Sequence, residues 1–192
     1  MKASILSVEH ESDAWRGQLL SSLTAYMLRW SEEFETIDRF MQFVQREPAC
    51  FERSTVEGHI TAAAWLIDPA SERVLLTHHR KLDKWLQLGG HADGCGDTRA
   101  VAMQEAQEES GIRDVRILSD DIFDIDIHPI PARSQDPAHL HFDVRYVFQA
   151  LSQDFTVSHE SHDLAWVPID RIERYTTEES MKRMAKKWLT HW

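Results

Sequence analysis

The sequence predicts an α/β protein of the α+β type, with a mixed sheet or sandwich flanked by helices and an N-terminal helical extension. Apolar residues recur at every third or fourth position through the first third of the chain, which is the spacing of amphipathic helices. Short strand-like runs separated by turn residues follow. Because these runs do not alternate strictly with helices, a doubly wound parallel sheet is disfavoured.

The N-terminal extension, residues 1–57, is expected to contain two helices. The first covers about residues 13–30, with Ser12 or Asp13 as its capping residue. The second stops before Pro48, because proline lacks the N–H that a helix needs. The apolar stripes of such helices usually pack into a core. A homodimer contact and a lid over a substrate are alternative uses of the same surface.

The remaining segment, residues 58–192, is expected to form the sheet-containing domain. The expected strands are residues 59–67, 73–79, 85–88, 115–128, 140–151 and 164–167. The first two form a hairpin, because Asp68-Pro69-Ala70-Ser71 between them has the composition of a turn. One helix is expected over Thr98–Ser110, between Asp97 as its N-cap and Gly111 as its C-terminal stop. A last helix covers about residues 177–192.

The charge balance argues against nucleic acid as the main partner. Lysine and arginine total 21 and aspartate and glutamate total 32, so the formal charge is 21 − 32 = −11. Such a surface repels a long phosphate backbone, whereas a small anionic substrate is accommodated if a cation neutralises the site locally.

The cysteines and the apolar segments favour a cytoplasmic protein without a membrane partner. Cys50 and Cys95 are too few for a disulfide framework or a cysteine zinc site. We find no apolar run of membrane-spanning length and no signal peptide.

Three glutamates on the helix after the glycine loop predict a metal site. Glu105, Glu108 and Glu109 stand at positions i, i+3 and i+4, so their carboxylates share one helical face. These like charges repel one another, and they lie near the negative end of the helix dipole. A divalent cation with a preference for oxygen ligands relieves both effects. A solvated acidic helix face gives the same spacing without a metal.

The segment from Gly90 to Ile112 resembles the box of the Nudix family, G-x5-E-x7-R-E-U-x-E-E-x-G-U, in which U is aliphatic. The residues that match the box are Gly90, Glu105, Ala106, Glu108, Glu109, Gly111 and Ile112. Two positions depart from it, because Gly96 replaces the first glutamate and Gln104 replaces the arginine. The resemblance covers about residues 58–174, and it implies a Nudix fold.

The resemblance also implies the ligands of the metal. In the family the last three box glutamates and the main-chain carbonyl of the glycine before the box bind a divalent ion. These roles fall on Glu105, Glu108, Glu109 and Gly89, with Mg²⁺ or Mn²⁺ as the cofactor. An acidic residue in a later loop, here Glu160, often joins them. Glu105, Glu108 and Glu160 are thus the candidate catalytic residues, with Glu105 and Glu160 as alternatives for the general base.

A second polar face is expected on the strand that follows the proline-containing loop. His139, His141 and Arg145 alternate with apolar residues, which directs them to one side of a strand. Together with His91, which follows the two glycines, they are candidate substrate-binding residues. A solvent-facing side of a sheet produces the same alternation. A zinc site at His139 and His141 is a third interpretation, but it lacks a third ligand.

The resemblance implies a hydrolase that cleaves the diphosphate linkage of a nucleoside diphosphate joined to another moiety. Its partner is then a small nucleotide-like substrate. The loss of the box arginine and of the first glutamate supports an alternative, a non-catalytic nucleotide sensor of the same family. A plain interaction protein that uses its N-terminal helices is a further alternative, and it predicts no metal binding.

Overall fold

The computed structural model describes residues 2–132, 137–159 and 161–192, with side chains from Glu11 onward. In chain order the elements are α1 (Lys2–Arg29), the 3₁₀ helix η1 (Ser31–Glu33), α2 (Phe34–Arg46), β1 (Gly58–Ile67), β2 (Arg73–His79), β3 (Lys84–Leu86), β4 (Leu88–His91), α3 (Thr98–Ser110), β5 (Val115–Ile117), β6 (Asp124–Ile130), β7 (His139–Ala150), β8 (Ser161–Pro168), η2 (Ile169–Arg174) and α4 (Glu179–His191). The strand order is β3-β2-β1-β7-β5, with β4 paired to β1, β6 to β7 and β8 to β2. This mixed sheet with flanking helices confirms the predicted fold class.

The chain divides into two compact units. Unit 1 comprises Met1–Thr61, His91–Thr98 and Ile125–Val144, and unit 2 comprises Ala62–Gly90, Arg99–Asp124 and Arg145–Trp192. Within the described residues, no helix combines the length and apolar character needed to cross a bilayer.

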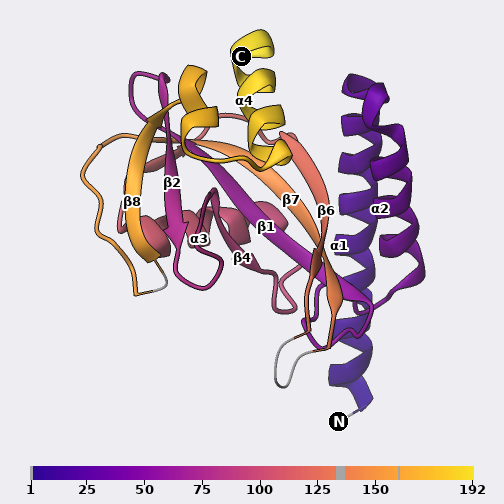
Figure 1. Ribbon diagram of the computed structural model, residues 1–192. Coiled ribbons are helices and arrows are strands. Elements are labelled where there is room, and N and C mark those ends of the chain that lie inside the picture. The colour runs from indigo at the N-terminus through magenta and orange to yellow at the C-terminus, as the bar shows by residue number, and fades with distance from the viewer. Residues whose placement is uncertain (1, 133–136, 160) are drawn as a thin grey trace. The chain divides into compact units, whose positions relative to one another are not determined.

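Unit 1 contains the helical extension, in which α1 and α2 lie side by side (Figure 1). α1 begins at Lys2, earlier than the predicted start at about residue 13, and α2 ends before Pro48 as predicted. The apolar stripe of α2 is buried, and its Phe43 ring stacks on Phe142 of β7 with centroids 3.8 Å apart. Burying one such side chain contributes about 1.5–3 kcal/mol, so these rings hold α2 in place.

Unit 2 has a core between its strands and α4. β2 pairs antiparallel with β8 from Arg73↔Pro168 to His79↔Ser161, and the two strands lie side by side in Figure 1. The buried core residues are Trp65, Ile67, Val74, Leu76, Phe123, Val147, Val167, Ile169, Ile172, Met181, Met184, Ala185 and Trp188. On α4, Met181, Met184 and Trp188 face the strands, as helical spacing indicates, whereas Leu189 is 59% exposed.

The predicted strand over residues 115–128 is two strands. β5 ends at Ile117 and β6 starts at Asp124. Between them the Ser119 hydroxyl accepts a hydrogen bond from the backbone N–H of Asp121, 3.1 Å away. Such a local bond favours a turn over an extended strand, which explains the interruption.

Candidate functional site

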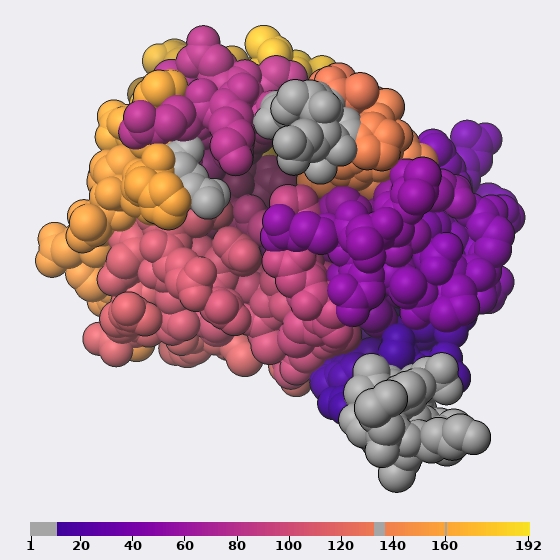
Figure 2. Space-filling view, turned by 90° about the horizontal axis from the view of Figure 1, so that it is seen from below, coloured from indigo at the N-terminus to yellow at the C-terminus, as the bar shows by residue number. Residues whose placement is uncertain are grey.

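The acidic helix of the predicted metal site is α3, and its bounds are Thr98–Ser110 as predicted. It ends where Gly111 adopts φ +73° and its N–H donates to the carbonyl of Gln107 at 2.9 Å. Glycine takes this left-handed conformation without strain, which explains the stop. Ala102 and Ala106 are fully buried, whereas Gln104 and Glu108 are exposed. In Figure 2, α3 and the segment that follows it (pink) form a continuous part of the surface of unit 2.

Glu109 is hydrogen-bonded to Gly89, the first glycine of the Gly89–Gly90 pair that precedes the loop before α3. Its Oε1 accepts a hydrogen bond from the backbone N–H of Gly89 at 2.7 Å. Glu109 is only 7% exposed, and a carboxylate removed from water requires hydrogen bonds or a nearby cation. This hydrogen bond fixes the position of the Glu109 carboxylate and holds Gly89 next to α3.

Glu105 lies against the second glycine. A Cβ atom built on Gly90 would overlap the carboxylate of Glu105. The glycine therefore leaves a space that this carboxylate occupies. At Gly89 a Cβ would come within 2.6 Å of Cβ of Ala63 on β1, so the first glycine is also required by close packing.

Glu108, the third carboxylate, is held by the residue that replaces the family arginine. Gln104 Nε2 donates to Glu108 Oε1 at 2.8 Å, which is the i to i+4 contact expected on a helix. Glu109 is thus held by Gly89, and Glu108 is held by Gln104. Glu105 occupies the space beside Gly90. A set of carboxylate oxygens suits a hard divalent cation such as Mg²⁺ or Mn²⁺, so the residues present fit the predicted metal.

The N-terminal extension fills the space beside Gly96, the residue that replaces the first glutamate of the box. A Cβ atom at Gly96 would overlap the indole ring of Trp15 on α1, within unit 1. Asp93, a carboxylate of the same loop, is paired with Arg53 through two contacts of 2.5 Å. The hydrogen bond from Arg53 lowers the pKa of Asp93. The loop before α3 is therefore packed against the extension by both residues.

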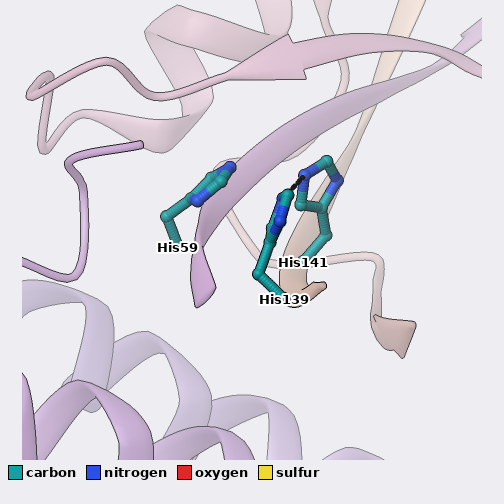
Figure 3. Close-up of side chains that lie close together, drawn as sticks. All are labelled: His59, His139 and His141. Carbon is teal, nitrogen blue, oxygen red and sulfur yellow. Dashed lines mark hydrogen bonds between the residues drawn. The ribbon is translucent and has the colours of Figure 1, made fainter. Parts of the chain in front are cut away.

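Three histidines come together in unit 1, and one of them was not predicted from the sequence. His139 and His141 lie at the start of β7, and His59 lies near the start of β1 (Figure 3). One ring nitrogen from each of the three lies within 4.8 Å of the other two. His59 is 2% exposed, and it occupies a strand that otherwise reads as apolar. A histidine at the start of an apolar strand is the sequence signal that could have identified it.

Burial keeps two rings of this cluster, those of His59 and His141, neutral at pH 7. Burial, together with the neighbouring His91 and His139, lowers the pKa of His59 to about 4. Burial also lowers the pKa of His141 to about 2, with contributions from His128 and His91. A neutral imidazole keeps a lone pair on one nitrogen, which is the form that binds metals.

Two further histidines, His91 and His128, lie around the cluster. The ring of His91 is 5.0 Å from that of His59 and 5.1 Å from that of His141, between centroids. The ring of His128 on β6 is 5.4 Å from that of His141, and its Nδ1 is 3.3 Å from a carboxylate oxygen of Asp126. The structure therefore brings the predicted residues His91, His139 and His141 together.

Arg145, also expected on the histidine-bearing polar face, lies in a buried ion cluster of unit 2. It is 2% exposed, and its guanidinium is 3.0 Å from a carboxylate oxygen of the fully buried Asp124. Arg183 and Lys187 of α4 bind the same carboxylate at 2.8 Å and 2.6 Å. Arg145 thus helps to join β6, β7 and α4. Glu160, the candidate base in the later loop, lies outside the described residues.

Comparison with known proteins identifies related domains. The NUDIX domain family matches residues 58–188 of the chain. A hydrolase of the NUDIX family from Clostridium perfringens has a similar structure with a TM-score of 0.51 and 22% identity, over 68% of this chain and 95% of that chain. A MutT protein from Methanosarcina mazei Go1 has a TM-score of 0.52 and 17% identity, over 69% and 93%. No curated protein was found to match the sequence.

A third similar structure is the dihydroneopterin triphosphate pyrophosphohydrolase of E. coli, with a TM-score of 0.51 and 13% identity, over 69% of this chain and 97% of that chain. At these identities the structural likeness establishes the fold and leaves the substrate open. The family match begins at Gly58 and includes the glycine pair and the whole of α3.

Proposed function

Because the chain belongs to the Nudix family of pyrophosphohydrolases, we propose that it cleaves the diphosphate linkage of a nucleoside diphosphate joined to another moiety, with Mg²⁺ or Mn²⁺ as cofactor. The family and the hydrolase class expected from the sequence are both confirmed by the match over residues 58–188. The observation that carries the proposal is the attachment of the acidic helix to the glycine pair, through Glu109 with Gly89 and Glu105 with Gly90.

Glu105, Glu108 and Glu109 are the proposed metal ligands, together with the carbonyl of Gly89. When bound, a divalent ion supplies positive charge to the diphosphate oxygens and lowers the pKa of a coordinated water. A carboxylate has about four lone-pair sites, so the hydrogen bond from Gly89 orients Glu109 without exhausting its capacity. The hydrogen bond from Gln104 orients Glu108 in the same way.

The general base is proposed to be Glu105 or Glu160, with Glu108 as a further catalytic carboxylate. A base must lie within hydrogen-bond reach of the water whose proton it accepts. The position of Glu105 beside Gly90 supports this residue, because the missing Cβ of the glycine leaves room for its carboxylate.

A small nucleotide-like molecule is the proposed substrate, and long nucleic acid is disfavoured by the net charge of −11. His91 follows Gly90 directly in the chain, and we propose that it contacts the diphosphate. We also propose a cytoplasmic location, which the two free cysteines support. The exposed side chains of Leu28 and Phe34 in the helical extension are the proposed contact of a homodimer.

The test is a substrate panel assayed for product release with Mg²⁺ and with Mn²⁺. The panel holds nucleotide sugars, dinucleoside polyphosphates and dinucleotide cofactors. We expect metal-dependent release from at least one class, and loss of that release in Glu109→Gln. Tight nucleotide binding without release from any member of the panel would instead identify a sensor.

A further inference from the structure

His59 has a buried polar side chain near the start of β1. Its side chain is almost completely removed from solvent, and neither Nδ1 nor Nε2 forms a hydrogen bond within the described residues. Buried polar atoms in native proteins are nearly always paired, and an exception points to a missing water, ion or functional role. Among the residues that the structure describes, His59 belongs to the one group of three side chains that could share a metal ion, and the other two members are also imidazoles.

The geometry of His139 and His141 is that of two ligands of one ion. His139 Nδ1 lies 2.9 Å from the carbonyl oxygen of Pro137, and donation to that carbonyl leaves the lone pair on Nε2. This Nε2 is 3.3 Å from Nε2 of His141, the contact dashed in Figure 3. Two nitrogens bound at about 2.0–2.1 Å to a tetrahedral zinc ion lie about 3.3 Å apart, so the observed separation fits a shared ion.

We propose that His59, His139 and His141 form a second metal site that takes a borderline transition-metal ion of the Zn²⁺ class. The site shares no ligand with the glutamates of α3. Its donors are all imidazole nitrogens, which favour Zn²⁺, Cu²⁺ or Ni²⁺ and do not suit Mg²⁺. Three protein ligands leave a fourth tetrahedral position open, as in zinc sites that bind water or a substrate atom.

A hydrogen-bonded histidine pair does not explain the cluster equally well. If His141 Nε2 carried a proton, it could donate to Nε2 of His139, and those two rings would be satisfied. His59 would still have two buried nitrogens with no hydrogen-bond partner in the described parts of the chain. An ion bound by all three rings satisfies His59 as well as the pair, which is why the metal is preferred.

The experiment is a Zn²⁺ titration of the full chain, measured by calorimetry. Metals are removed beforehand with a chelator. We expect about one Zn²⁺ bound per chain by the histidines. His59→Ala, His139→Ala and His141→Ala are each expected to lower that affinity about 100-fold or more. The matched control is His191→Ala, an exposed histidine of α4, which should bind Zn²⁺ as the wild type does.

Three further measurements separate this site from the glutamate site, separate it from misfolding, and report its coordination geometry. Glu109→Gln removes a proposed magnesium ligand, so it should leave Zn²⁺ binding unchanged while Mg²⁺-dependent hydrolysis is lost. Saturating Zn²⁺ should raise the Tm of the wild type and of His191→Ala but not that of the three alanine variants, whose metal-free Tm reports whether they fold. Co²⁺ in the same site should give the visible absorption bands of tetrahedral coordination. Zn²⁺ binding that survives in the folded alanine variants, or is lost in Glu109→Gln instead, would overturn the proposal.

Discussion

Glu109 accepts a hydrogen bond from the backbone N–H of Gly89 through Oε1, at 2.7 Å, although these residues lie on different elements. Glu109→Gln keeps an acceptor oxygen for this bond and removes the negative charge. We expect kcat to fall about 100- to 1000-fold, the loss typical when one electrostatic group of an active site is removed. Steady-state kinetics with Mg²⁺ on a substrate found in the panel measures the change.

The control for Glu109→Gln is Glu173→Gln, which neutralises an exposed glutamate of η2. Its kcat should equal that of the wild type. Thermal unfolding should give nearly the same Tm for both variants and the wild type. Near-normal turnover of Glu109→Gln would contradict the assignment of this carboxylate to the metal.

Gly90 is predicted to be required for the position of Glu105 and not for the backbone conformation. Gly90 is not among the glycines with positive φ, so alanine fits its backbone, but the added methyl group would displace the carboxylate of Glu105. We expect Gly90→Ala to remain folded and to lose activity about 10- to 100-fold, as when an orienting contact of a metal ligand is removed. Activity and Tm are measured on the same preparations.

Gly17→Ala is the matched control for that substitution. Gly17 lies in α1, and apart from its chain neighbours and the nearby backbone of its own helix, no described atom lies within 4 Å of the position of an added Cβ. Alanine in a helix is favoured over glycine by about 0.5–1 kcal/mol, so Tm should rise slightly while activity stays unchanged. Equal activity losses in both variants would show that Gly90 has no special relation to Glu105.

Trp15 is predicted to exclude the first box glutamate. Gly96→Glu restores the family residue but forces a side chain into the space of the indole ring. Overpacking of this kind costs about 1–3 kcal/mol, measured as a loss of unfolding free energy in urea. In the double variant Trp15→Ala/Gly96→Glu the ring is absent, so the two effects should not add, with a coupling energy of about 0.5–3 kcal/mol. Additive losses would contradict a direct contact.

The parts of the site that depend on local sequence could be predicted, and those that depend on strand pairing could not. Helix α3 has its expected bounds because its stop residue, Gly111, and its apolar spacing lie in one short window. The contact between Gln104 and Glu108 follows from helical spacing alone. His59 joins His139 and His141 only through the arrangement of β1 and β7, which period-two patterns do not specify.

Arg145 lies in the part of β7 where alternation of polar and apolar residues does not predict which side chains are exposed. Along β7 the residues before Phe142 are half-buried, and every residue from Phe142 to Ala150 is buried. Alternation of polar and apolar residues distinguishes a solvent-facing side from a core-facing side only where one side of the strand meets water. Beyond Phe142 both faces are covered, so a charged residue there requires a buried partner, which Asp124 provides.

The buried Asp124 is predicted to be the most sensitive charged residue for stability. Asp124→Asn removes the anion that Arg145, Arg183 and Lys187 share. Breaking a buried pair by removal of one partner costs about 3–5 kcal/mol, because the remaining charges stay out of water. Urea unfolding at pH 7 measures the loss. Asp114→Asn, at an exposed loop position, should leave the unfolding free energy nearly unchanged.

The same carboxylate predicts a pH dependence with a definite sign. Burial raises the pKa of Asp124, but the hydrogen bond from Arg183 and the charges of Arg183, Arg145 and Lys187 outweigh it, so the pKa is lowered from 3.8. The unfolded chain therefore binds the proton more readily, and the stabilisation is complete above about pH 4 and is lost as the pH falls through the folded-state pKa. Tm measured from pH 7 downward should decline below about pH 4, more steeply in the wild type than in Asp124→Asn. Parallel curves for the two proteins would assign the acid sensitivity to other carboxylates.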